Sequence, residues 1–390
     1  MKKFISGAFL LSCASYLMVN CITTNSVTKP ATAENNNPID LLRKLYSSGD
    51  SKNWPKPNLD ESSKIGFVDI GHLPEVQFPA DNQYSKEKEE LGKTLFYDPR
   101  LSQSNQIACA SCHDPELAWT DNKTLSFGHN RQLGSRNAMS ILNSAYATSL
   151  FWDGRAKSLE DQAQQPVTNP VEMNEHLDLA VEKIAKIKGY QDLFKKAFGS
   201  SEINEDKITK AIATFERTIK SGSTKFDRFI DGKSEVYSDS EVNGLNLFRT
   251  KARCINCHNT GYFSDNKFEN DGTALLGSKL EDLGRYNVTK NLADLGKFRV
   301  PTLREVARTG PWMHNGSFTP LRDVLTFYNA GNPEIKNKDM ATINGVKYKS
   351  PKSKKLQPLN LTKDEIEDLE AFLETLSSRP QRIIVPELPQ

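Results

Sequence analysis

Apolar residues recur at helical spacing in several long stretches of the chain. One helical face, between residues 203 and 219, carries Ile208, Ala211, Ile212, Phe215 and Ile219. A second face follows a capping box made by Thr362 and Glu365, and it carries Ile366, Leu369, Phe372, Leu373 and Leu376. Spacings of three and four residues are typical of amphipathic helices, and few segments alternate with the two-residue period of strands. The pattern therefore predicts a mainly α fold.

Two shorter stretches with matching apolar and glycine positions predict a pair of related helices. Residues 90–96 read ELGKTLF, and residues 241–248 read EVNGLNLF. Ser85 is a suitable N-cap ahead of the first stretch, and Ser238 with Glu241 forms a capping box at the second. The organisation of the chain therefore looks duplicated.

The N-terminal residues predict an export signal. Two lysines precede an apolar run at residues 4–19 that serine and tyrosine interrupt, which is more typical of a signal peptide than of a membrane span. We assign residues 1–21 to this signal. Cys21 stands where a lipoprotein signal places its lipidated cysteine, and Cys13 is the weaker candidate.

Length and composition indicate the domain organisation. A chain of 390 residues exceeds one ordinary core, which suggests two domains behind a leader. Residues 22–72 form a tether and N-terminal extension, because their first part is rich in threonine, asparagine and serine. A Ser-Gly-Ser run at residues 221–223 ends the helix predicted before it, so we expect one domain over 73–222 and another over 223–380. The 51 basic and 49 acidic residues nearly cancel, which gives no reason to expect a nucleic-acid partner.

The most specific chemistry lies in two copies of the motif Cys-x-x-Cys-His. The two copies consist of Cys109, Cys112 and His113, and of Cys254, Cys257 and His258. In this motif the two thiols form thioethers with a porphyrin, and the imidazole binds its iron. Zinc binding and redox disulfides are alternatives, but zinc ligands usually lie closer together than these two copies.

We therefore predict two covalently bound haem c groups in tandem cytochrome c-like domains. Covalent attachment of this kind occurs outside the bacterial cytoplasm. We expect a periplasmic protein, which would be anchored to a membrane if Cys21 carries a lipid.

From about residue 73 to residue 376 the sequence resembles the bacterial di-haem cytochrome c peroxidases and the related methylamine utilisation protein MauG. The resemblance rests on blocks that agree in order and spacing, namely LGKTLFYDPRLS (91–102), GSRN (134–137), FWDGR (151–155), NPVEM (169–173), FERT (215–218), VPTLR (300–304) and PWMHNGSF (311–318). It implies that the first haem, on His113, reacts with hydrogen peroxide. The second haem, on His258, would serve as the electron reservoir.

The resemblance assigns roles to three residues around the first haem. Glu172 occupies the position of the family's distal glutamate, where a carboxylate can move a proton between the two oxygens of peroxide. His129 lies in a glycine-flanked loop where the classical peroxidases place a histidine that caps the resting iron, and a solvated loop histidine is the alternative. Trp152 matches an indole between the two haems, which would relay electrons.

Tyr328 determines which branch of the family the chain follows. It lies 14 residues after His314, where the peroxidases carry a methionine as axial ligand of the second haem and MauG carries a tyrosine. A neutral thioether favours ferrous iron, whereas an anionic phenolate favours ferric iron, so Tyr328 predicts a second haem of low potential that needs no prior reduction. Met313 and Met340 are the fallback ligands.

The resemblance also implies a calcium ion between the domains. Asn137, Thr309 and Pro311 match the positions that hold it, and oxygen ligands suit this hard cation. The peroxidases of this family are commonly dimers, so a homodimer is a further expectation.

Three functions remain open from the sequence. His129 favours a peroxidase that reduces hydrogen peroxide with electrons from a small c-type cytochrome or cupredoxin. Tyr328 favours a MauG-like oxidase that modifies a protein side chain by long-range electron transfer. A plain two-haem electron carrier is the third function, but it has no use for Glu172. The lysine-rich insertion at residues 336–355 could dock an acidic redox partner or form a solvated loop.

Overall fold

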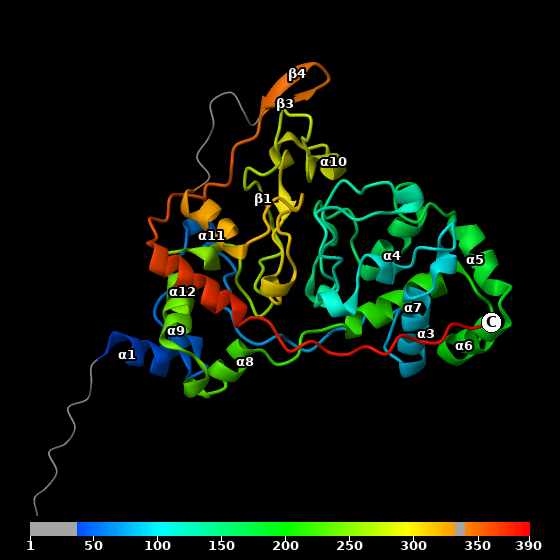
Figure 1. Ribbon diagram of the computed structural model, residues 1–390, viewed down its shortest axis with the longest axis horizontal. Helices are drawn as coiled ribbons and strands as arrows, with labels where there is room; N and C mark the ends of the chain where they lie inside the picture. The colour runs from blue at the N-terminus through cyan, green and yellow to red at the C-terminus, as the bar shows by residue number, and fades with distance from the viewer. Residues whose placement is uncertain (1–36, 332–339) are drawn as a thin grey trace, which may run out of the picture. The chain divides into compact units, whose positions relative to one another are not determined.

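The computed structural model describes residues 37–331 and 340–390 (Figure 1). The predicted signal peptide with Cys13 and Cys21 lies outside these residues, as do Lys336 and Lys338 of the lysine-rich insertion. Within the described part of the chain, no helix has both the length and the apolar character needed to cross a membrane.

Helices dominate the described residues, which confirms the predicted mainly α fold. The helices are α1 (Pro38–Tyr46), α2 (Glu61–Lys64), α3 (Lys86–Phe96), α4 (Leu159–Thr168), α5 (Leu177–Ala185), α6 (Lys188–Phe198), α7 (Glu205–Thr218), α8 (Lys225–Ile230), α9 (Asp239–Arg249), α10 (Tyr286–Thr289), α11 (Leu321–Asn329) and α12 (Lys363–Glu374). Two antiparallel ladders pair β1 (Phe268–Glu269) with β2 (Phe298–Arg299), and β3 (Met340–Ile343) with β4 (Val346–Lys349).

Hydrogen bonds at the helix ends confirm the predicted caps. The Ser85 hydroxyl accepts a hydrogen bond from a backbone amide in the first turn of α3. Ser238 and Glu241 form a reciprocal capping box at α9, and Thr362 and Glu365 form one at α12. Each box satisfies amides that the helix itself leaves without partners.

The glycines shared by the two matching stretches lie at helix crossings. A Cβ atom on Gly92 of α3 would stand 1.9 Å from the carbonyl oxygen of Ala211 on α7. A Cβ atom on Gly244 of α9 would stand 1.9 Å from the carbonyl oxygen of Asp368 on α12. Both helix pairs therefore approach backbone to backbone, and the C-terminal helix α12 packs along α9.

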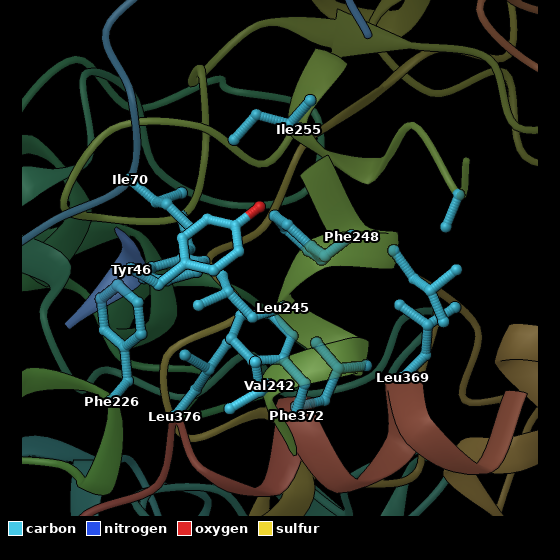
Figure 2. Packing of buried hydrophobic residues seen from close by; sticks show 14 of the residues in the cluster. Tyr46, Ile70, Phe226, Val242, Leu245, Phe248, Ile255, Leu369, Phe372 and Leu376 are labelled. Atoms are coloured by element: carbon cyan, nitrogen blue, oxygen red, sulfur yellow. The ribbon is translucent and has the colours of Figure 1, made fainter. Parts of the chain in front are cut away.

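Two large hydrophobic cores surround these helix pairs. The first contains Leu91 of α3 and Phe215 of α7, and Cys109 of the first motif packs against it. In the second, α9 and α12 contribute side chains that converge in Figure 2, among them Val242, Leu245, Phe248, Leu369 and Phe372. Cys254 of the second motif packs against this second core. One motif thus adjoins each core, while the domain boundary at residue 222 stays a prediction.

The two ends of the described chain pack against the core that lies farther from them in sequence. Tyr46, Trp54 and Ile70, which precede the first motif, are buried in the second core. The last residues return to the first core, against which Ile383 packs. There the Pro389 carbonyl oxygen accepts a hydrogen bond from Arg100. Each core therefore includes a segment that is far in sequence from the other residues of that core.

Arg249, at the end of α9, anchors the N-terminal segment to the second core. Its side chain is fully buried and forms an ion pair with Asp69. Its guanidinium carbon lies 5.4 Å from the centre of the Tyr46 ring and 5.0 Å from that of the Trp54 ring, within cation–π range. The buried charge is thus compensated entirely by residues that precede the first motif.

Candidate functional site

The second motif opens onto a largely apolar cavity. Cys254, Cys257 and His258 line this cavity, and Tyr328 of α11 lies in the same lining. His258 Nδ1 is 3.1 Å from the carbonyl oxygen of Phe263. Such a contact orients the ring and leaves Nε2 available to a metal ion, as is usual for histidine ligands.

Tyr328 is half-buried on the wall of this cavity, near both cysteines. Burial raises the pKa of its hydroxyl well above the ordinary value, and the nearby charges of Asp271 and Cys257 add to the effect. The protein alone therefore disfavours the phenolate, so a bound metal cation would have to stabilise it. Met313 lines the same cavity, whereas Met340 begins β3 and is not part of the described lining.

Trp152 lies on the wall of this cavity beside a pair of stacked rings. Its indole nitrogen donates a 2.9 Å hydrogen bond to the Asn137 carbonyl oxygen. The ring of His314 lies 6.5 Å from the Trp152 ring and stacks on Phe298 at 3.7 Å. Burial lowers the pKa of His314 to about 4, against an opposing effect of Asp282. The histidine is thus uncharged at neutral pH and behaves as one more aromatic ring.

The three residues of the expected calcium site share the lining of this cavity. Asn137, Thr309 and Pro311 all contribute to it. The Asn137 amide nitrogen donates to the Lys123 carbonyl oxygen at 2.8 Å, and the Thr309 hydroxyl donates to the Val306 carbonyl oxygen at 3.3 Å. Both side chains therefore keep an oxygen lone pair for a cation, and the calcium site stays a prediction.

The first motif repeats the geometry of the second. His113 Nδ1 lies 3.1 Å from the carbonyl oxygen of Trp119, so this imidazole is also held by its Nδ1 side. Burial raises the pKa of the Cys109 and Cys112 thiols, and the charge of Glu172 adds to both shifts. Glu172 is therefore within electrostatic range of both cysteines, although 59 residues separate it from His113 in the sequence.

Local hydrogen bonds hold Glu172 in a turn after α4. Its Oε1 accepts a 2.8 Å hydrogen bond from the Asn169 amide nitrogen. Burial raises the pKa of Glu172, against the opposing effects of Arg155 and the Asn169 hydrogen bond. The turn thus presents a fixed carboxyl group that keeps its proton to higher pH than an exposed glutamate does.

His129 lies in a loop that docks on the same turn. Its backbone amide donates to the carbonyl oxygens of Val171 at 3.0 Å and Glu172 at 2.7 Å. A Cβ atom on Gly128 would stand 2.0 Å from the Val171 oxygen, so only glycine permits this approach. The buried His129 Nδ1 has no hydrogen-bond partner among the described residues. The structure thus brings His129 and Glu172 together, and iron binding by His129 stays a prediction.

Known proteins match this sequence along most of the chain. Residues 86–235 match the family model of the di-haem cytochrome c peroxidases. The chain is 39% identical to the methylamine utilization protein MauG of Methylorubrum extorquens, over 80% of this chain and 85% of that protein. It is 36% identical to the cytochrome c551 peroxidase of Nitrosomonas europaea, over 77% of this chain and 83% of that one. The chain belongs to the di-haem cytochrome c peroxidase and MauG family.

Solved structures of this family agree with the fold. The crystal structure of a MauG-like protein associated with microbial copper homeostasis is 31% identical and aligns with a TM-score of 0.70, over 79% of this chain and 94% of that one. Family membership makes the chain a peroxide-dependent oxidoreductase of the cytochrome-c peroxidase type with two covalently bound haem c groups, in tandem cytochrome c-like domains as predicted.

The cavity at the second motif contains a basic group that fits a haem. Arg299 lines this cavity with 5% of its surface exposed, and its Nη1 has no hydrogen-bond partner among the described residues. A buried guanidinium nitrogen without an acceptor is costly, and a haem propionate is the kind of anion that would pair with it. The residues present therefore fit the cofactor.

Two further groups at the site are not evident from sequence spacing. Arg136 pairs with Asp153 and with Asp282 at 2.6 Å each, so it ties the GSRN block to FWDGR and to the loop before α10. Glu216 of α7 lies near Cys109, and burial raises its pKa to about 8. The only sequence signal was the position of Arg136, Asp153 and Glu216 inside family blocks, which does not say what they contact.

Proposed function

We propose that this family member is a periplasmic peroxidase that reduces hydrogen peroxide with electrons from a small c-type cytochrome or cupredoxin. The observation that carries the proposal is the position of Glu172, a half-buried carboxyl group that Asn169 fixes within electrostatic range of both cysteines of the first motif. An electron carrier would gain nothing from an acid–base group at that place.

Glu172 can perform the proton transfers that peroxide reduction requires. Conversion of hydrogen peroxide to two water molecules consumes two electrons and two protons. The haem iron, when bound, supplies the electrons to the oxygen–oxygen bond. The ionised Glu172 carboxylate takes a proton from one peroxide oxygen and returns it to the other, and burial makes it a stronger base than an exposed glutamate. Arg155 nearby favours the ionised form that starts this sequence.

The second site stores and relays electrons in this proposal. Trp152 lines the cavity of the second motif and lies edge-on to the His314 ring, so it would offer an intermediate between the two centres. Asn137, Thr309 and Pro311 would hold a calcium ion beside it. A lipid on Cys21 and a homodimer belong to the same proposal, as expectations from the family.

A MauG-like activity is the second candidate, and Tyr328 favours it. A tyrosinate on the second iron would favour its ferric form and would make prior reduction unnecessary. The relative named MauG has the higher identity of the two relatives compared above. In this case the electrons would come from a side chain of a protein substrate instead of a soluble donor.

Two assays of the holoprotein test the candidates, namely peroxide turnover with a small reductant and addition of peroxide to the fully oxidised protein without any reductant. We expect Glu172→Gln to lower kcat/KM for peroxide by about 10²-fold or more, because it removes the general base. Glu202→Gln, at an exposed position, is the matched control. If the two variants behaved alike, the proposed role of Glu172 would be wrong.

Tyr328→Met separates the two candidates. Rapid loss of the ferric electron paramagnetic resonance signals in wild type, but not in Tyr328→Met, would favour the MauG-like activity. Dependence on a prior one-electron reduction in both proteins would favour the peroxidase.

A further inference from the structure

The β3–β4 hairpin places residues 340–355 of the lysine-rich insertion on a structured surface. Ala341 pairs with Tyr348, and Thr342 pairs with Lys347. Because side chains alternate between the faces of a strand, Ala341 and Tyr348 point to one face and Lys347 to the other. Ala341 is fully buried and Tyr348 is half-buried, whereas Lys347 is exposed. The hairpin thus has one packed face and one basic solvent face.

This basic face adjoins the loop that contains α10. Gly277 approaches the backbone of Met340 so closely that a Cβ atom would stand 2.8 Å from its carbonyl oxygen. The Ser350 hydroxyl donates a hydrogen bond to the Leu295 carbonyl oxygen at 2.5 Å. Hairpin and loop lie together in Figure 1, where β3, β4 and α10 are labelled. Residues 275–297 and 340–355, which we call the hairpin surface, therefore form one structural element.

The hairpin surface is more basic than the chain as a whole. It contains nine lysine or arginine residues and three aspartate or glutamate residues, although the chain as a whole has a net charge of only +2. Lys279 and Lys347 are exposed and form no ion pair with any described residue. Uncompensated charges on one face attract an oppositely charged partner and speed its association.

Exposed apolar side chains accompany these lysines. Leu280 is 76% exposed, Val346 is 51% exposed and Leu275 is 42% exposed. An apolar centre with a charged rim is typical of a protein–protein contact and is costly to leave in solvent. A nucleic acid or an anionic lipid surface would use the lysines but would gain less from the leucines.

A small hydrophobic core connects the hairpin surface to the electron relay. Ala274, Leu295 and Phe298 are buried in it, and Tyr348 packs against it from the hairpin. Trp152 packs against the same core, and Phe298 stacks on His314. A partner on the hairpin surface would thus lie over the small core that Trp152 also contacts.

We infer that the hairpin surface is the docking site of a small acidic redox protein that delivers electrons toward Trp152. This inference rests on the proposed peroxidase function, since it names the place where the donor binds. The donor gives one electron at each binding event, so two binding events supply two electrons. With two protons these electrons convert one hydrogen peroxide to two water molecules, so the balance is complete.

Charge reversal on the hairpin surface tests the inference in the holoprotein. The probe is an acidic plastocyanin, with a basic mitochondrial cytochrome c as the opposite-charge donor. For Lys279→Glu combined with Lys347→Glu, we expect kcat/KM for plastocyanin to fall about tenfold at low ionic strength, mainly through KM. The difference should shrink as salt screens the charges. The matched control is Lys52→Glu combined with Lys56→Glu, at exposed positions between α1 and α2.

Further measurements keep a failure of docking distinct from a failure of the proposed function. Peroxide turnover with the small reductant tetramethylphenylenediamine should be unchanged in both double variants. Calorimetric titration with oxidised plastocyanin should show the same loss of affinity without any turnover. Equal effects of the two double variants, an absence of salt dependence, or binding to phosphatidylserine vesicles with unaltered plastocyanin kinetics would each overturn the inference. Loss of turnover with every reductant, at intact plastocyanin affinity, would overturn only the peroxidase function.

Discussion

Replacing Glu216 with glutamine should stabilise the protein at neutral and slightly alkaline pH. Glu216 is 3% exposed on α7, and its Oε2 has no hydrogen-bond partner among the described residues. Burial raises its pKa to about 8, although Arg217 opposes the shift. In the unfolded chain the same carboxyl group titrates near 4.5.

Between these two pKa values, the folded protein binds a proton that the unfolded chain has lost. The free energy of unfolding therefore falls as pH rises from about 4.5 to about 8, by up to about 1.4 kcal/mol per pH unit. From pH 5 to pH 7.5 the wild type should lose about 3 kcal/mol through this group alone. Glutamine resembles the protonated acid in shape and has no proton to lose, so the variant lacks this slope.

Urea unfolding of holoprotein at several pH values measures the effect. Subtracting the variant's free energy of unfolding from that of wild type cancels every other titrating group. Infrared spectra give an independent readout, because wild type at pH 6 should show a carboxylic acid C=O band that Glu216→Gln lacks. The reasoning would be refuted if the difference in free energy of unfolding between wild type and variant stayed constant from pH 5 to pH 7.5, and if both proteins showed the same infrared C=O band.

Three further predictions follow from packing and charge. Burial would raise the pKa of Glu160, but hydrogen bonds from Arg217 and Asn82 lower it to about 2. The ionised Glu160 therefore stabilises the fold above pH 4.5, and this contribution of about 3 kcal/mol is lost as the pH falls toward 2. Acid unfolding of Glu160→Gln should lack this loss. Gly244→Ala should lower the free energy of unfolding by about 3 kcal/mol in a urea titration, because its Cβ would stand 1.9 Å from a backbone oxygen of α12. Gly71→Ala is the control and should change stability little, because the space around that position is open. Arg299→Gln should lower the reduction potential of the second haem in a spectroelectrochemical titration, while Arg299→Lys should largely retain the wild-type potential. Equal potentials in wild type and both variants would exclude a propionate contact.

The helices and their caps could be predicted because they depend on residues that are close in sequence. The repeated glycine of the two matching stretches was visible as well, but only the structure gives its reason, a carbonyl oxygen of the facing helix at Ala211 or Asp368. A periodic pattern identifies the buried face of a helix and leaves its partner open. The contact of Tyr46 with Arg249 therefore could not be foreseen, since about two hundred residues separate the two.

The candidate site shows the same division between local and distant information. The two cysteine motifs specify their cofactor by themselves, because all covalent ligands lie within five residues. Glu172 and Tyr328 could be placed only through the family resemblance, since each meets its motif across a long stretch of chain. The strands of the insertion were not predicted, because four residues per strand give little alternation. The lysines Lys347 and Lys349 also make the sequence look uniformly polar, although Ala341 and Tyr348 form an apolar face.

The crossed packing of the chain ends limits how this protein can be divided. A fragment starting at residue 73 would keep both cysteine motifs but would leave Arg249 without the aromatic rings and the carboxylate that surround it. A fragment ending at residue 222 would lack the stretch around Ile383 that covers the first core. In a chain emerging in order, Tyr46 and Trp54 stay exposed to solvent until Arg249 of α9 has been synthesised, after all the helices of the first core.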